Sequence, residues 1–382
     1  MYRPSSPSSP LGVLTSLGQS LWLDFIDRKM TRSGELKALI EKRAVRGVTS
    51  NPSIFEQAIA KSDTYDEAIV RIGADGRGAA AIFEQLAVED VREACDLFRP
   101  IHEMSGGNDG FVSIEVSPRL AFDTQGSLEE ARRLWRSVAR PNVLVKIPGT
   151  DEGVPAIAEA LSEGINVNIT LLFAVSMYEK VIDAYITGIE RRLAAGHGVE
   201  TLRSVASFFV SRVDTETDKR LEALAARGTD RSKIEPLLGT AAIANAKIAY
   251  QKYVQHFEGE RFRAVMGKGA AVQRPLWAST STKNPRYEPT KYVDNLIGPD
   301  TINTLPPQTL EEFARHGVAA RTIDADLGKA RSDIARIEAL GISLADVTDF
   351  LVTDGVKKFA DSYTSLLAAV EAKRARLVTA RV

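Results

Sequence analysis

The stretch Asn142-Val-Leu-Val-Lys-Ile-Pro148 decides how the fold of this chain is interpreted. Apart from Asn142 and one lysine it is apolar and rich in valine, which is typical of a strand buried on both faces in a parallel sheet. A second apolar run, Ile165 to Leu172, is followed by Val175 to Ala195, a segment whose apolar residues have helical spacing. A buried strand followed by an amphipathic helix predicts a βα unit.

The same unit recurs on both sides of this stretch. Eight short apolar runs are predicted to be parallel strands: Ser20–Ile26, Val45–Asn51, Phe111–Ser117, Asn142–Pro148, Ile165–Leu172, Ser204–Val210, Pro275–Ser281 and Thr301–Leu305. Eight βα units in one chain predict an α/β protein with a closed (β/α)8 barrel, the TIM barrel.

The segments outside these units predict the domain organisation. Two long connections, 51–111 and 212–275, are each predicted to hold about two or three helices inserted on the barrel. The chain is predicted to end in a helix over 321–340 and one or two more over 343–377. Residues 1–15, which begin with a Ser/Pro run, are predicted to be a disordered tail, and residues 16–382 a single barrel domain.

Composition excludes several classes of function. The 382 residues are 44% hydrophobic and 26% charged, with a formal net charge of −1, which argues against nucleic acid or an anionic membrane as the main partner. No run approaches eighteen consecutive apolar residues, so no membrane span is predicted. The single cysteine, Cys95, cannot form an internal disulfide, and the stretch 11–23 is too polar to be the core of a secretion signal. These features predict a cytoplasmic protein.

Neither a metal nor an organic cofactor is expected. No cysteine cluster exists, and the four histidines are not spaced as metal ligands. They are His102, His197, His256 and His316. The glycine-rich segments around Gly73 and Gly267 lack the spacing of a dinucleotide fingerprint or a P-loop.

The carboxyl ends of the predicted strands carry polar side chains. Catalytic groups of a barrel enzyme lie at these ends, whereas a barrel with only a structural role would show mostly Val, Ile, Leu and Ala there. The polar residues, in chain order, are Asp24, Thr49-Ser50-Asn51, Glu115, Lys146, Asn168 and Thr170, Ser207 with Arg212 soon after it, and Ser279 to Lys283. The pattern therefore predicts an active site at this rim.

Lys146 is the most informative of these residues. Burial disfavours its ammonium form, and a neutral amine is what attack on a carbonyl requires. Asp24 and Glu115 would supply two carboxylates for the proton transfers of Schiff-base chemistry. The alternative is structural: Lys146 reaches out from a strand end, or forms an ion pair with Glu115 or Asp24. The other polar residues at the rim favour catalysis.

Arg212, Ser281 and Lys283 follow the sixth and seventh predicted strands. The late strand loops of many barrels bind phosphate, and an arginine with a hydroxyl and a lysine suits that ligand. The alternative is that Arg212 pairs with Asp214 or Asp218 on the surface.

Five motifs in the same order along the chain resemble the transaldolase family, and the long insertions resemble its longer bacterial branch. The motifs are Val48-Thr-Ser-Asn-Pro-Ser-Ile-Phe55, Ser113-Ile-Glu-Val-Ser-Pro-Arg119, Val145-Lys-Ile-Pro148, Gly164-Ile-Asn-Val-Asn-Ile-Thr-Leu-Leu-Phe173 and Gln273-Arg-Pro-Leu-Trp-Ala-Ser-Thr280. The resemblance runs from about Leu21 to the final helix.

The resemblance implies a role for each candidate position. Lys146 corresponds to the Schiff-base lysine, Glu115 and Thr170 to a pair that transfers protons through a water, and Asp24 to the acid/base at the C4 hydroxyl. The remaining implied contacts are Asn51, Asn168 and Ser207 with the hydroxyls of the dihydroxyacetone unit, and Arg212 and Ser281 with phosphate. Lys283 stands where the family commonly has an arginine.

The implied reaction moves a dihydroxyacetone unit between sugar phosphates. The donor would be sedoheptulose 7-phosphate or fructose 6-phosphate, and the acceptor glyceraldehyde 3-phosphate or erythrose 4-phosphate. One rival is a fructose-6-phosphate-type aldolase that releases free dihydroxyacetone; those relatives typically carry glutamine at 115 and tyrosine at 209, so Glu115 and Phe209, at the substrate, favour transfer. A non-catalytic binding barrel is a second rival, and a monomer or homodimer is expected.

Overall fold

Eight parallel strands close into a barrel in the computed structural model, which describes residues 9–379. They follow one another around the barrel in chain order. Their bounds are β1 (Gln19–Leu23), β2 (Val45–Val48), β3 (Phe111–Glu115), β4 (Val143–Pro148), β5 (Val167–Leu172), β6 (Ser204–Phe209), β7 (Arg274–Ala278) and β8 (Thr301–Leu305). Each predicted run overlaps one strand, so the (β/α)8 prediction is confirmed.

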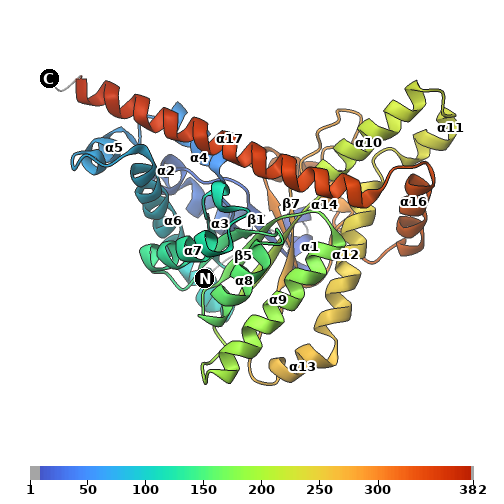
Figure 1. The fold of residues 1–382 in the computed structure, drawn as a ribbon, viewed down its shortest axis with the longest axis horizontal. Helices are drawn as coiled ribbons and strands as arrows, with labels where there is room; N and C mark the ends of the chain where they lie inside the picture. Colours follow the sequence, from blue (N-terminus) through green and yellow to red (C-terminus); the bar gives the residue numbers. More distant parts are fainter. Residues whose placement is uncertain (1–8, 380–382) are drawn as a thin grey trace.

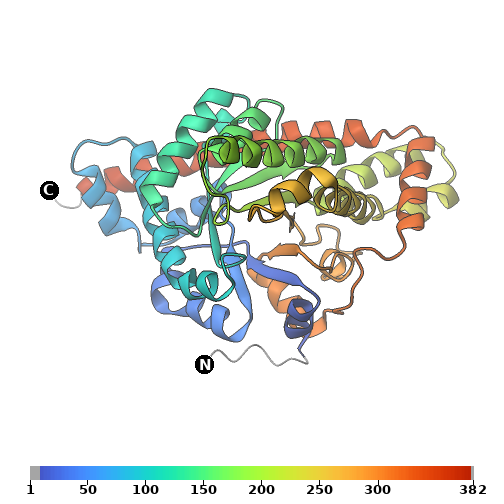
Figure 2. The same ribbon diagram turned by 90° about the horizontal axis from the view of Figure 1, so that it is seen from below.

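Helices surround the barrel (Figures 1 and 2). They are α1 (Pro10–Ser16), α2 (Arg28–Ser33), α3 (Glu35–Lys42), α4 (Pro52–Lys61), α5 (Asp66–Gly73), α6 (Ala79–Met104), α7 (Thr124–Val138), α8 (Gly153–Ser162), α9 (Val175–Ala194), α10 (Ser211–Ala226), α11 (Arg231–Ile234), α12 (Ala241–Phe257), α13 (Glu260–Met266), α14 (Lys291–Asp294), α15 (Pro307–His316), α16 (Leu327–Ala339) and α17 (Leu344–Thr379), with 3-10 turns at Pro118–Leu120 and Glu235–Leu237. Both long connections are helical insertions, as expected, although 212–275 holds more helices than predicted.

Strand register brings the candidate residues together. In the β3–β4 pair Glu115 lies opposite Lys146, and in the β4–β5 pair Lys146 lies opposite Asn168. Leu23 and Val48 are paired at the ends of β1 and β2, so the next residues, Asp24 and Thr49, leave the barrel side by side. Parallel pairing in a closed barrel therefore places polar groups distant in sequence on one rim.

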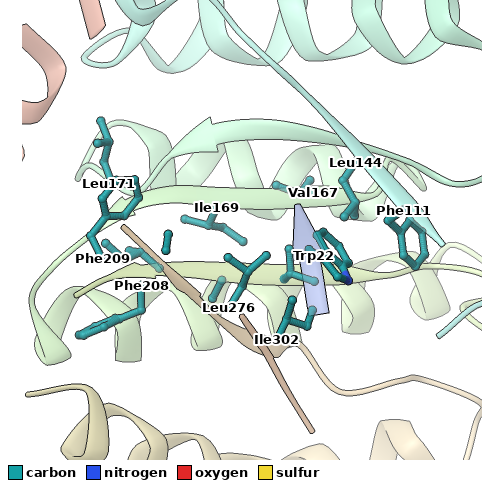
Figure 3. Packing of buried hydrophobic residues seen from close by; sticks show 14 of the residues in the cluster. Trp22, Phe111, Leu144, Val167, Ile169, Leu171, Phe208, Phe209, Leu276 and Ile302 are labelled. Atoms are coloured by element: carbon teal, nitrogen blue, oxygen red, sulfur yellow. The ribbon is translucent and has the colours of Figure 1, made fainter. Parts of the chain in front are cut away.

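Large apolar side chains fill the opposite end of the barrel interior. Figure 3 shows Trp22 and Phe111 at one end of the buried cluster and Leu171 and Phe209 at the other. The Trp22 and Phe111 ring centroids are 6.4 Å apart, and the Trp22 indole N–H donates to Asp109 at 2.9 Å. The neighbouring strand accommodates the indole because position 47 is glycine: a Cβ there would lie 2.5 Å from the Trp22 ring.

The predicted disordered tail covered residues 1–15, and the structure corrects this prediction for residues 9–15. Residues 1–8 lie outside the described part, but Pro10–Ser16 form helix α1, with Leu11 and Leu14 buried. Ser9 caps this helix by accepting a hydrogen bond from the Gly12 amide at 3.1 Å. Serine as the N-cap followed by proline at the first helical position is a helix start signal. The single domain over 16–382 stays a prediction.

The C-terminal helices differ in extent from the prediction. The helix expected over 321–340 begins at Leu327, because the amides of Thr322 and Ile323 donate instead to the Ile297 carbonyl, each at 3.0 Å. The final segment is one helix, α17, which runs past α10 and α4 to α5 (Figure 1) and contacts all three. Between residues 9 and 379, no helix is both long enough and apolar enough to cross a membrane.

Candidate active site

A cavity of about 210 Å³ opens at the carboxyl ends of the strands. Its lining residues come from both ends of the chain: Asp24, Thr49, Asn51, Ser53, Lys146, Thr170, Ser207, Phe209, Arg212, Ala278, Ser279, Ser281, Lys283, Thr304, Pro306 and Phe359. Nine of the eleven predicted site residues line this cavity, and the other two, Glu115 and Asn168, lie directly behind it through contacts with lining residues.

Lys146 lies deep in the barrel, with only 5% of its side chain exposed. Its Nζ donates to the Ser50 carbonyl at 3.0 Å and to Glu115 Oε2 at 3.1 Å. The ion pair that was the structural alternative is therefore present. Burial raises the pKa of Glu115, although the adjacent Lys146 opposes the shift. A carboxylate with raised proton affinity in contact with a lysine can take its proton, so the pair also suits amine activation.

Asp24 follows β1 and lies against Thr49. Thr49 Oγ1 donates to Asp24 Oδ1 at 2.7 Å, and the Asp24 amide donates to the Leu305 carbonyl at 2.8 Å, which fixes the residue between β8 and β2. Burial raises the pKa of Asp24, while Thr49 and the cations of Lys146, Arg212 and Lys283 lower it in part. This carboxyl group is held separately from Glu115, as two different proton-transfer roles require.

The hydroxyl-binding candidates divide into two groups. Asn51 and Ser207 line the cavity, although Asn51 Oδ1 also caps α4 by accepting from the Ile54 amide at 3.0 Å. Asn168 is fully buried, and its side-chain amide forms hydrogen bonds within the protein. Ser207 donates to its Oδ1 at 2.7 Å, and its Nδ2 donates to Ser113 at 2.9 Å. In this geometry Asn168 positions Ser207 and does not itself open onto the cavity.

Thr170 presents an uncommitted hydroxyl. Its Oγ1 is buried at the cavity wall and has no hydrogen-bond partner. The next residue, Leu171, has a φ of 58°, and the pairing of β5 with β6 is irregular between Ile169 and Leu172. This local irregularity lies at the carboxyl end of β5, where strand irregularities often orient active-site side chains.

Arg212 and Lys283 make one wall of the cavity positive. Arg212 lies in the first turn of α10, and its Nη1 is buried without a hydrogen-bond partner. It does not pair with the carboxylates expected as the alternative, because Asp214 bonds Lys291 and Tyr292 and Asp218 bonds Tyr287. Lys283 donates to Ser281 Oγ at 2.6 Å. Burial lowers the pKa of both Arg212 and Lys283.

The sequence analysis did not single out several lining residues. One is Phe359 of α17, whose ring centroid lies 5.9 Å from the guanidinium carbon of Arg212; the ring of Phe209, which was predicted, lies 5.3 Å from the same carbon. Nothing in the periodicity of the last helix indicates that it reaches this cavity. Thr304 was missed although it lies near the carboxyl end of β8, the same signal that identified polar residues at the other seven strand ends.

Comparison with known proteins decides the family. The family model described as transaldolase/fructose-6-phosphate aldolase matches residues 21–370. The chain belongs to this family. Relatives named transaldolase include one from Frankia alni, 47% identical over 364 residues that cover 95% of this chain and 97% of the relative, and one from Mycobacterium marinum, 46% identical over 371 residues that cover 97% and 98%.

A relative named transaldolase 2, from a Nostoc species, is 46% identical over 362 residues, which cover 93% of this chain and 95% of the relative. The recognition of the family from five motifs is thus confirmed over nearly the whole chain. In this transaldolase-family barrel, no three acidic, histidine or cysteine side chains of residues 9–379 gather closely enough to hold a metal ion.

Proposed function

We propose that this protein is a transaldolase that carries a dihydroxyacetone unit on Lys146 as a Schiff base. The observation that carries the proposal is a buried amine whose Nζ lies 3.1 Å from Glu115, in a cavity with a second carboxylate and a cationic wall. The names of the relatives, at 46% to 47% identity over nearly full length, support the same reaction.

Imine formation uses the Lys146–Glu115 pair. Glu115 takes a proton from the ammonium group, and the free amine attacks the C2 carbonyl of a ketose phosphate. The carbinolamine then loses its hydroxyl as water, with the required proton delivered from Glu115 and the leaving water stabilised by the free hydroxyl of Thr170. Burial raises the pKa of Glu115, which suits a group that alternately holds and releases this proton.

Cleavage uses Asp24. The carboxylate takes the proton from the C4 hydroxyl as the C3–C4 bond breaks, the bonding electrons enter the protonated imine, and an aldose phosphate leaves. The resulting enamine stays on Lys146 until an acceptor aldehyde enters, and the reverse steps form the new bond. Asn51 and Ser207 would hold hydroxyls of the three-carbon unit, and their position in the cavity lining supports this role.

The cationic wall supports phosphorylated substrates. Arg212 has an unpaired buried N–H group, Lys283 and Ser281 lie nearby, and the amino terminus of α10 adds its partial positive charge. Sedoheptulose 7-phosphate or fructose 6-phosphate as donor and glyceraldehyde 3-phosphate or erythrose 4-phosphate as acceptor are the proposed pairs.

Reductive trapping tests the covalent step. The protein is incubated with fructose 6-phosphate, reduced with borohydride and analysed by intact mass. We expect one added dihydroxyacetone unit or sugar phosphate on the wild type and none on Lys146→Ala or on Lys146→Arg, which keeps the charge but supplies no neutral amine. An adduct that persists in both folded variants would overturn the proposal.

A second measurement distinguishes transfer of the dihydroxyacetone unit to an acceptor from its release as free dihydroxyacetone. The family description covers both activities, whereas Glu115 and Phe209 favour transfer. We expect fructose 6-phosphate to be consumed rapidly only when glyceraldehyde 3-phosphate is present. Release of free dihydroxyacetone at the same rate without an acceptor would instead identify an aldolase.

Two further proposals concern the compartment and the oligomeric state of the protein. We propose that it acts in the cytoplasm, where sugar phosphates occur, and that it works as a monomer or homodimer. Light scattering coupled to gel filtration measures the mass of the particle directly, and a particle larger than a dimer would contradict the second point.

A further inference from the structure

Thr49 and Thr304 form a short chain of hydroxyl groups that ends on Asp24. Thr49 Oγ1 lies 2.7 Å from Asp24 Oδ1 and 2.7 Å from Thr304 Oγ1. Thr49 directly follows β2 and Thr304 is the penultimate residue of β8, on either side of the strand that leads to Asp24, and each is only 2% exposed. Both line the cavity.

The direction of these hydrogen bonds follows from the number of protons. An ionised carboxylate only accepts, so Thr49 must give its single proton to Asp24. The contact between the hydroxyls then requires the proton of Thr304. The chain Thr304 to Thr49 to Asp24 is therefore complete when Asp24 is ionised.

A protonated Asp24 reverses the order. The carboxyl group can donate to Thr49, which then donates to Thr304, and the proton of Thr304 loses its acceptor. Within residues 9–379, Thr304 Oγ1 makes no hydrogen bond except the one to Thr49. Within this chain of hydroxyls, every donor is therefore satisfied in the ionised state, whereas one donor is left without an acceptor in the protonated state.

We propose that Thr49 and Thr304 are positioning residues that orient the Asp24 carboxylate and keep it ionised for removal of the C4 hydroxyl proton. The inference rests on the proposed transaldolase function, because that function supplies the proton that Asp24 takes. Thr304 touches neither the Asp24 carboxylate nor Lys146 in any hydrogen bond, so it acts through Thr49.

Other charged groups also face Asp24, and the threonine substitutions leave them in place. Lys146 of β4, Arg212 of α10 and Lys283 after β7 favour the carboxylate, whereas burial and the like charge of Glu115 on β3 disfavour it. The Thr304 backbone is held independently of its hydroxyl, since its carbonyl accepts from Thr280 Oγ1 at 3.3 Å and β8 pairs with β1. Valine, which has nearly the same shape, should therefore fit at 304.

The test is the pH profile of kcat/KM for transfer from fructose 6-phosphate to glyceraldehyde 3-phosphate. In Thr49→Val the carboxylate loses a donated hydrogen bond, so its pKa rises and the acid limb moves to higher pH by about one unit. Thr304→Val should move the limb in the same direction by a smaller amount, and Thr304→Ser should restore it. Thr217→Val, which removes a buried hydroxyl on α10 that has no partner, is the matched control and should leave the profile unchanged.

Borohydride trapping on the same proteins separates this inference from the proposed function. If the wild type forms no adduct, the Schiff-base proposal fails. If the wild type and Thr304→Val both form the adduct but their profiles superimpose, the hydroxyl chain is overturned and the proposed function stands. Failure of Thr304→Ser to restore the limb would also overturn it, because the effect would then be one of packing.

Discussion

At the residue scale, the buried carboxyl group of Asp24 serves the proposed reaction but lowers the stability of the folded protein at neutral pH. Burial raises its pKa even though three cations lie nearby. A carboxyl group with a higher pKa in the folded state binds its proton more tightly there than in the unfolded chain. The stability of the protein therefore falls as pH rises from the ordinary carboxyl pKa through the raised one, and this contribution stays unfavourable at neutral pH.

We therefore predict that Asp24→Asn lowers kcat by at least about 100-fold, the usual contribution of a general base, while the folded protein becomes more stable at pH 7. The amide oxygen can still accept from Thr49, so the local geometry is retained. Urea unfolding at pH 4 and pH 7 measures the second effect. The stability advantage of the variant should grow with pH, and an advantage that shrinks would contradict the sign worked out above.

Lys283 provides a second prediction at this scale. Its charge faces the same space as Arg212, but Lys283 is the more exposed of the two, so its loss should weaken phosphate binding only moderately. We expect Lys283→Ala to raise KM for fructose 6-phosphate about three- to tenfold with a smaller change in kcat. Lys283→Arg should retain binding, because arginine can replace the point charge with a fork of donors. Equal KM values for all three proteins would exclude a phosphate contact.

The same scale shows why much of the site could be predicted. Lys146, Asp24 and Glu115 stand out in sequence because each interrupts or ends an apolar run, and parallel strand ends meet at one rim. The hydrogen bonds that Asn168 makes within the protein could not be predicted, since they depend on Ser113 and Ser207 from other strands. Hydrogen bonds between residues far apart leave no periodic signal.

At the scale of elements, the eight strands were predictable and the helices less so. A strand buried on both faces is marked by its composition, whereas α16 begins at Leu327 because upstream amides bond to the Ile297 carbonyl. The position of α17 on the barrel could not be predicted from the sequence either. Its apolar residues predict a helix but do not indicate that Gly355 and Phe359 lie against Arg212.

Gly355 allows α17 to approach the cavity closely. A Cβ at this position would lie 3.1 Å from Leu171 Cδ2 and 3.5 Å from Arg212 Nη1. We predict that Gly355→Leu displaces the helix or the guanidinium and raises KM for fructose 6-phosphate by about tenfold or more. The variant should still form the imine at Lys146, and this is measured by borohydride trapping at saturating substrate.

Thr353→Leu on the exposed side of the same helix is the control and should leave KM unchanged. If Gly355→Leu binds substrate as the wild type does, α17 has no part in setting the phosphate site.

At the scale of the whole molecule, the closed barrel separates a packed end from a reactive end. Closure leaves no free strand edge, and every strand shares in both the interior packing and the polar rim. The amino-terminal part of the interior is filled by the Trp22 indole, which packs beside Phe111 (Figure 3). The indole N–H donates to Asp109. Stability and catalysis are thus assigned to different ends of the same strands.

This separation predicts that a packing defect at the filled end weakens the fold before it alters the chemistry. In Gly47→Ala the new Cβ would lie 2.5 Å from Trp22 ring carbons and 2.8 Å from the Phe111 carbonyl, so the ring or the strand must move. We expect a loss of about 1–3 kcal/mol in unfolding free energy, measured by urea unfolding, with the folded fraction retaining KM. Gly328→Ala, in the exposed first turn of α16 with open space around its Cβ, should be neutral or slightly stabilising. A change in KM without a change in stability would show that the two ends are coupled.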